Sequence, residues 1–287
     1  MLNSELKLIE CPRDAMQGLH DFIPTEIKAH YINSLLKCGF DTIDFGSFVS
    51  PKAIPQMRDT ADVLSRLNLN ESTKLLAIIA NERGAREATS FEEINYLGYP
   101  FSVSEEFQKR NTNSTITDSL SLVESIQNTC VKSGKELVVY LSMGFGNPYG
   151  EEWNPDIVQK WCEILYSKFD VKIQAVSDTI GSANPYQVKD LFSQLISLLP
   201  SVEFGAHLHT KPADAKELIA AAYTSGCRRF DAAIKGFGGC PMAKDDLTGN
   251  MPTETMLDWF NENLINTGID EGMFNKAYLE ANSVFPM

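Results

Sequence analysis

The stretch that decides the fold is residues 202–224, which read VEFGAHLHTKPADAKELIAAAYT. Its first six residues, which end at His207, form a short apolar run that is typical of a buried β-strand. Pro212 then opens a helix-like segment that runs to Thr224, since proline is tolerated in the first turn of a helix. One strand followed by one helix is therefore the expected structural unit.

This unit recurs along the chain, with almost no low-complexity sequence and no linker that would separate domains. The expected strands are residues 6–10, 40–45, 74–80, part of 93–103, 136–142, 172–177, 202–207 and 229–233. The expected helices are residues 24–38, 55–67, 82–89, 117–133, 155–168, 185–199, 212–224 and 252–263. Each strand is thus followed by helix-like sequence.

Eight such rounds in 287 residues predict an α/β protein with the (β/α)₈ TIM-barrel fold, for which about 250 residues is typical. A doubly wound open sheet is the alternative, but the first strand is not followed by the G-x-G-x-x-G pattern of a dinucleotide-binding fold. We interpret residues 1–287 as a single catalytic domain. The residues after Met273 predict an extra C-terminal helix, 274–280, on the outside of the barrel.

Composition and net charge indicate a soluble protein without a nucleic-acid or membrane partner. Hydrophobic residues make up 43% of the chain and charged residues 22%, as in ordinary globular proteins. The net charge of -13 disfavours nucleic acid and anionic membranes, because both require a cationic surface. Neither a basic and apolar leader nor an apolar run of about 18 residues occurs, so we expect a cytoplasmic protein. Its six cysteines lack C-x-x-C pairs and are interpreted as reduced thiols.

Reactive side chains gather at the ends of four expected strands, where a TIM barrel carries its active site. They are Arg13 and Asp14 after the first strand, Asp44 and Ser47 at the second, Asp178 and Thr179 after the sixth, and His207 and His209 at the seventh. Loops are polar in any barrel, but this chemistry at four strand ends exceeds what solvation requires. The pattern therefore predicts an active site at this end of the barrel.

The pair His207 and His209 is a candidate metal site. Residues two apart on a strand point to the same face and lie roughly 6 to 7 Å apart along the chain, so both imidazoles can reach one ion. The alternative is a pair of histidines that ends a strand without binding anything.

The segment after the eighth strand has two interpretations. Gly238 and Gly239 precede Cys240, which suits a lid that carries a thiol to the barrel mouth, or else a flexible connection with an incidental cysteine. Asn250, further along, is either an oxygen ligand or the N-terminal cap of the last barrel helix.

Four segments together resemble the 3-hydroxy-3-methylglutaryl-CoA lyase family, a group of metal-dependent, aldolase-like TIM-barrel lyases. They are CPRDAMQ (11–17), SFVSPKAIPQM (47–57), SDTIG (177–181) and GGCPMAK (238–244). The resemblance is collinear from about residue 6 to residue 260. The second and fourth segments are specific to the lyases, whereas the Arg-Asp and His-x-His pieces are shared with isopropylmalate and homocitrate synthases.

The resemblance implies a divalent metal ion, Mg²⁺ or Mn²⁺. The implied metal ligands are Asp14, His207, His209 and Asn250, and the residues implied in cofactor binding are Gln17 and Ser47. Carboxylate, imidazole and amide-oxygen ligands suit these ions and leave positions open for substrate oxygens.

The implied reaction is cleavage of 3-hydroxy-3-methylglutaryl-CoA to acetoacetate and acetyl-CoA. A base removes the proton of the C3 hydroxyl, the bond to the thioester α-carbon breaks, and Arg13 stabilises the charge on the thioester oxygen. Cys240 protonates the enolate carbon, or lies beside the group that does, once the glycine loop closes. Asp44 and Asp178 are candidates for base or orienting roles. His207 is the base that the resemblance favours, although the residues themselves leave the base undecided.

The chain departs from the lyase pattern at several positions. Asp44 replaces the usual glutamate, Thr210 replaces the aspartate after His-x-His, and His20 replaces a lysine thought to contact the CoA phosphates. The loop between Cys240 and Asn250 is one residue longer than usual. A neutral histidine is a poorer phosphate partner than lysine. These departures keep open a related aldolase or lyase that acts on a different hydroxy acid or CoA ester, and a non-catalytic metal-binding barrel.

The partner expected from this interpretation is a small molecule, either a CoA thioester or a hydroxy acid. Apolar residues on the terminal helix also suggest a homodimer. The resemblance implies a place in leucine degradation.

Overall fold

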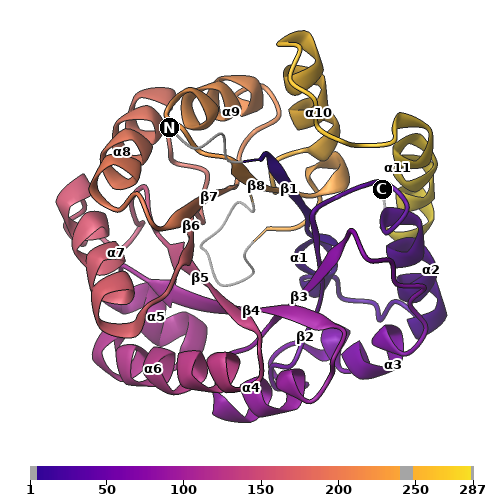
Figure 1. Cartoon of the computed structure of the whole chain (residues 1–287), viewed down its shortest axis with the longest axis horizontal. Coiled ribbons are helices and arrows are strands. Elements are labelled where there is room, and N and C mark those ends of the chain that lie inside the picture. Colours follow the sequence, from indigo (N-terminus) through magenta and orange to yellow (C-terminus); the bar gives the residue numbers. More distant parts are fainter. Residues whose placement is uncertain (1–4, 240–247, 286–287) are drawn as a thin grey trace.

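The computed structural model describes residues 5–239 and 248–285. Within them, eight parallel strands close into a barrel in sequence order, with β1 paired to both β2 and β8 (Figure 1). The strands are β1 (Lys7–Glu10), β2 (Thr42–Ser47), β3 (Lys74–Ile78), β4 (Ile94–Ser102), β5 (Glu136–Ser142), β6 (Ile173–Asp178), β7 (Glu203–Leu208) and β8 (Arg229–Ala232). The predicted (β/α)₈ barrel is confirmed.

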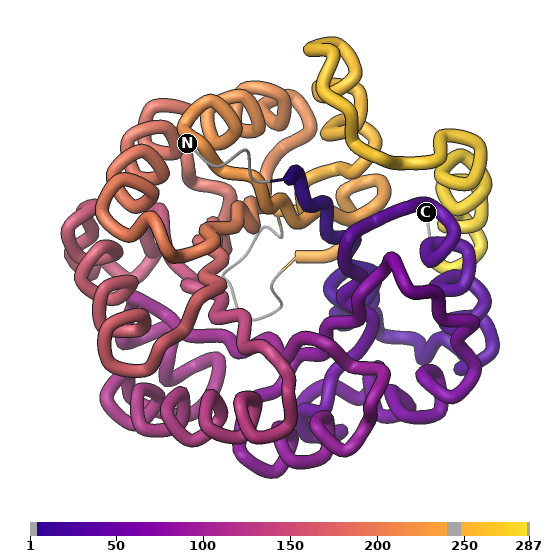
Figure 2. Tube along the Cα trace, viewed as in Figure 1, coloured from indigo at the N-terminus to yellow at the C-terminus, as the bar shows by residue number. Residues whose placement is uncertain are grey.

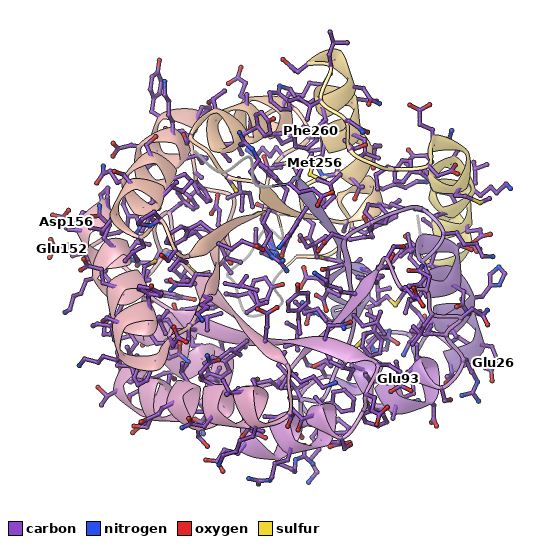
Figure 3. The ribbon with its side chains drawn as sticks, in the orientation of Figure 1. Glu26, Glu93, Glu152, Asp156, Met256 and Phe260 are labelled. Atoms are coloured by element: carbon purple, nitrogen blue, oxygen red, sulfur yellow. The ribbon has the colours of Figure 1, made fainter. Side chains whose placement is uncertain are left out.

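The helices form a ring around the barrel, and the chain trace runs once around it, from indigo to yellow (Figure 2). They are α1 (Pro12–Gln17), α2 (Thr25–Leu35), α3 (Thr60–Leu64), α4 (Glu82–Thr89), α5 (Glu105–Thr112), α6 (Ile116–Lys132), α7 (Pro155–Phe169), α8 (Pro185–Leu198), α9 (Ala215–Thr224), α10 (Thr253–Glu262) and α11 (Glu271–Val284), with 3₁₀ turns η1 (Pro55–Met57) and η2 (Ile234–Gly236). In Figure 3 the side chains of Met256 and Phe260 point from α10 toward the barrel, whereas Asp156 of α7 points outward. Each helix thus buries one face and leaves the other in solvent.

Three helical features differ from the prediction. The six-residue α1 and the eight-residue α5 were not predicted, because so few turns give little periodicity to detect. The predicted helix 55–67 is divided into η1 and α3. The terminal helix α11 is longer than the predicted 274–280, since the Asp270 side chain caps its N-terminus by accepting a hydrogen bond from the Met273 amide. It packs against α2, as Figure 2 shows.

The barrel is buried on both sides of its sheet. One large apolar cluster fills the space between strands and helices, and a smaller one lies among strands β3 to β6. The members of the smaller cluster are Leu76, Ile78, Tyr96, Val138, Tyr140, Ile173 and Ala175. All five cysteines in the described residues are buried and free, in line with the reduced state that we predicted. Among the described helices, none is long and apolar enough to span a bilayer.

Candidate metal centre and active site

Helix α1 begins where β1 ends and carries the Arg-Asp motif. Pro12 occupies its first turn, where the missing amide proton costs no hydrogen bond. Arg13 and Asp14 follow, both buried, and the Arg13 Nη1 atom donates to Asp14 Oδ1 at 2.8 Å. Gln17 lies one turn further on the same face: its Oε1 accepts from Arg13 at 2.9 Å and its Nε2 donates to Asp14 Oδ1 at 2.8 Å. The helix therefore holds a cation and an anion side by side at the carboxyl end of the barrel.

Asp44 on β2 fixes the other side of the guanidinium. The Arg13 Nε atom donates to Asp44 Oδ2 at 3.0 Å, and Nη2 donates to the same carboxylate. The pairing of β2 with β3 shifts register between Asp44 and Gly46, an irregularity that re-aims the neighbouring side chain. The shorter aspartate thus reaches Arg13 directly, without an intervening water molecule.

Asp14, His207 and His209 form a buried group of metal-ligand type. One ligand atom from each lies within 4.8 Å of the others. The His209 Nε2 and Asp14 Oδ2 atoms are 3.9 Å apart, too far for a hydrogen bond but a normal separation for two ligands of one ion. Asn250 lies beside this group, because its backbone bridges that of His209 and its Nδ2 donates to Asp14 Oδ2 at 2.7 Å. The structure thus brings together all four residues that the sequence suggested as ligands.

The electrostatics of this group favour a cation. Burial opposes ionisation of Asp14, but Arg13 and the two histidines outweigh it and lower the pKa of the carboxyl. Burial, together with the charge of His207, lowers the pKa of His209 to about 4. At neutral pH the carboxylate is ionised and the His209 imidazole is neutral, which are the protonation states that a metal ligand requires. The residues therefore fit a divalent ion.

The charge on Arg13 is secured by its two carboxylate partners. Burial disfavours the guanidinium, but Asp44 and then Asp14 raise the pKa of Arg13 above its ordinary value. Burial also dominates at Asp44, where it raises the pKa to about 6 in spite of Arg13. At pH 7 the result is a fixed positive charge whose position is set by hydrogen bonds to residues of helix α1 and strand β2.

Ser47 and Asp178 organise loops rather than joining the Arg13 cluster. The Asp178 carboxylate accepts hydrogen bonds from the amides of Ser182 at 3.0 Å and Ala183 at 2.7 Å, and burial raises its pKa. The Ser47 hydroxyl donates to the Ile78 carbonyl at 3.2 Å. Both side chains shape the segments that follow β6 and β2. Cys240 lies outside the described residues.

The positions that depart from the lyase pattern have different surroundings. His20 is fully exposed and its Nδ1 lies 3.1 Å from Asp21 Oδ1. Thr210 is buried, and its amide donates to the Gly249 carbonyl at 3.0 Å, which ties the end of β7 to the segment that carries Asn250.

Two buried carboxylates near the site were not predicted from the sequence. Asp231 on β8 lies 3.1 Å from His207, measured between Oδ2 and Nδ1. Glu10, at the end of β1, accepts hydrogen bonds from the Ile234 amide at 2.9 Å and the Thr253 hydroxyl at 2.6 Å. Both stand inside apolar strands, where a charged residue is costly unless it has a partner. An acidic residue within an apolar strand was therefore the feature of the sequence that could have indicated both positions.

Comparison with known proteins places this geometry in a family. The HMGL-like family matches residues 6–278. The chain is 31% identical over 258 residues to hydroxymethylglutaryl-CoA lyase YngG of Bacillus subtilis, which covers 90% of this chain and 85% of that protein. It is 30% identical to the mitochondrial hydroxymethylglutaryl-CoA lyase of Bos taurus, with 97% of this chain and 84% of that protein covered.

Solved structures agree with the sequence relatives. An HMG-CoA lyase from Acinetobacter baumannii, solved in complex with coenzyme A and 3-methylmalate, matches with a TM-score of 0.90 at 31% identity, covering 98% of this chain and 91% of that chain. The HMG-CoA lyase of Bacillus subtilis matches with a TM-score of 0.91 at 30% identity, covering 97% and 93%. Because sequence and fold agree over nearly the whole barrel, the chain belongs to the HMGL-like family of carbon–carbon lyases.

Proposed function

We propose that this protein cleaves 3-hydroxy-3-methylglutaryl-CoA to acetoacetate and acetyl-CoA with the help of Mg²⁺ or Mn²⁺. The observation that carries the proposal is the direct contact of Arg13 with Asp14, at 2.8 Å, because Asp14 also belongs to the group that fits a divalent ion. A fixed cation thus stands beside a metal site, as cleavage next to a thioester requires. The names of the relatives, and the coenzyme A bound to one of them, support the choice of substrate.

The metal ligands and Arg13 act on opposite ends of the substrate. A divalent ion, when bound through Asp14, His207, His209 and Asn250, supplies Lewis acidity and a template for hydroxyl and carboxylate oxygens. Arg13 faces the thioester end, where its guanidinium stabilises the negative charge that develops on the carbonyl oxygen as the carbon–carbon bond breaks. Asp44 keeps this guanidinium in place, so that no reorganisation is needed during the reaction.

Proton transfer requires one base and one acid. The resemblance suggests His207 as the base that takes the proton of the C3 hydroxyl. Because His207 contacts Asp231 through Nδ1 and is also a candidate metal ligand, neither of its nitrogens is free to accept this proton. Asp44, whose pKa is raised to about 6 by burial, is therefore our candidate for the base. Cys240 is our candidate for the acid at the enolate carbon, by the resemblance of its glycine-rich segment to the lyases. Gln17 and Ser47 stay candidates for contacts with the acyl-CoA, and Asp178 for shaping the loop beside it.

The cellular setting is proposed on the same basis. A lyase of this specificity acts in leucine degradation, and the composition of the chain suits the cytoplasm. A homodimer would be consistent with the exposed Leu279 on α11, which is 67% accessible.

The test is a substrate panel with purified protein and a thiol reductant. Release of acetoacetate from the CoA ester is expected with Mg²⁺ or Mn²⁺ and is expected to stop when the ion is chelated. Arg13→Met should reduce turnover by about 10²- to 10³-fold, as for loss of one preorganised charge contact. Arg86→Met is the matched control, since Arg86 is an exposed arginine on α4. Turnover of a hydroxy acid without CoA, and none of the CoA ester, would contradict the proposal.

A further inference from the structure

Asp231 stands directly behind the metal-facing histidine. His207 of β7 and Asp231 of β8 are register partners in the parallel sheet, so their side chains emerge at the same level inside the barrel. The His207 Nδ1 and Asp231 Oδ2 atoms are 3.1 Å apart, and both side chains are buried. The pair is therefore held by the backbone of two strands as well as by its hydrogen bond.

This contact determines which imidazole nitrogen is available. A carboxylate only accepts, so the hydrogen bond to Asp231 requires a proton on Nδ1. A neutral imidazole with its proton on Nδ1 has its lone pair on Nε2, at the other side of the ring. Nε2 is then the nitrogen that remains for an ion shared with Asp14 and His209.

Arg229 lies near Asp231 on β8. It lies two residues earlier on the same strand and hence on the same face, and it is fully buried. Its Nη1 donates to Glu203 Oε1 at 3.1 Å, and its charge interacts with that of Asp231. The Arg229 guanidinium and the Asp231 carboxyl thus belong to the same face of β8.

We propose that Asp231 is a positioning residue that holds His207 in the Nδ1-protonated form and thereby presents Nε2 to the divalent ion. The proposal rests on the metal site of the proposed function, but not on its substrate. Cys11 also lies within 4.8 Å of His207 and Asp231, so a second ion at Nδ1 is the rival arrangement that an experiment must separate.

The direct test is the tautomer of His207. The chain has only four histidines, so ¹⁵N-labelled imidazole spectra of the metal-free protein are simple, and loss of one set of signals in His207→Asn assigns them. Spectra are recorded at increasing pH until the His207 signals no longer change, because the ring is then neutral. We expect a protonated Nδ1 and a bare Nε2 in the unaltered chain, and an increase of the Nε2-protonated form in Asp231→Asn.

The second test is metal affinity. Titration calorimetry with Mn²⁺ should give one ion per chain, and Asp231→Asn should weaken binding by about 10- to 100-fold, as for other partners of metal-bound histidines. Asp21→Asn is a matched control, because the Asp21 and His20 atoms are also 3.1 Å apart but fully exposed; it should leave Mn²⁺ affinity unchanged.

The outcomes separate this inference from the proposed function. An Nε2-protonated His207 in the unaltered chain, two ions per chain, or unchanged affinity in Asp231→Asn would overturn the role of Asp231. The tautomer of His207 is measured on the unaltered chain, and only the variant used for assignment, His207→Asn, has to fold. A protein that binds one Mn²⁺ through Nε2 but cleaves no CoA ester would contradict the proposed function and leave the role of Asp231 intact.

Discussion

Replacing Glu10 by glutamine should make the protein more stable at high pH and change little at low pH. Glu10 is buried at the end of β1, and burial raises the pKa of its carboxyl from 4.5 to about 8, although Thr253 and the Ile234 amide oppose the shift. The folded chain therefore holds a proton on Glu10 that the unfolded chain loses above pH 4.5. Stability attributable to this group is complete below pH 4.5 and is lost as the pH rises through 8.

The magnitude follows from the width of that window. Between the two pKa values each pH unit changes the free energy of unfolding by about 1.36 kcal/mol, so the full window corresponds to an effect on the order of 5 kcal/mol. Glutamine has the shape of the protonated acid. Its amide oxygen can accept from the Ile234 amide, and its NH₂ group can donate to the Thr253 hydroxyl, which is able to reverse its role. Glu10→Gln should thus gain stability relative to the unaltered chain as the pH rises.

The assay is urea unfolding of both proteins at a series of pH values, because the difference between the two curves removes all other titrating groups. Glu93→Gln is the surface control, since Glu93 is exposed just before β4. A difference for Glu10→Gln that stays within about 0.5 kcal/mol, the usual error of additivity, across the whole pH range would refute the argument from burial.

Three further changes test packing, backbone and ligation. Phe260→Ala empties a fully buried position on α10, where the ring packs edge-on against Phe230, and should lower the free energy of unfolding by about 3 to 5 kcal/mol in the same urea assay. Gly84→Ala should destabilise α4, although alanine usually favours helices, because a new Cβ would lie 2.6 Å from the Phe48 carbonyl oxygen; a raised melting temperature would show that this loop yields. Asp14→Ala, which leaves no ligand oxygen at this position, should abolish Mn²⁺ binding in calorimetry, and retained binding would exclude Asp14 as a required ligand.

The strands, and the reactive side chains at their carboxyl ends, could be predicted from the sequence because each produces a recognisable pattern over a few residues. A buried parallel strand is a short apolar run, and polar residues that follow it stand out, as Arg13 and His207 do. Short helix α1 has no such signal, since its six residues complete fewer than two turns and only the Pro12 start marks it. Its presence explains how Arg13 and Gln17 come to share one face.

Contacts between neighbouring strands were harder to predict from the sequence, because they depend on the register of strand pairing. The pairing of His207 with Asp231 follows from the alignment of β7 with β8, which no residue of either strand specifies alone. The contact of Arg13 with Asp44 depends on the packing of α1 against β2. A pattern of residues along a chain shows which strand end carries an acid, but the partner of that acid is determined by the stagger of neighbouring strands.

Charge balance links these contacts to the need for an ion. Arg13 is shared between two buried carboxylates, Asp14 and Asp44. His209 adds little positive charge at pH 7, because burial lowers its pKa to about 4, and the charge of His207 acts on both Asp231 and Asp14. A buried carboxylate is costly unless a cation lies close to it. We therefore expect Asp14 to be the residue through which a divalent ion and the Arg13 guanidinium are held together.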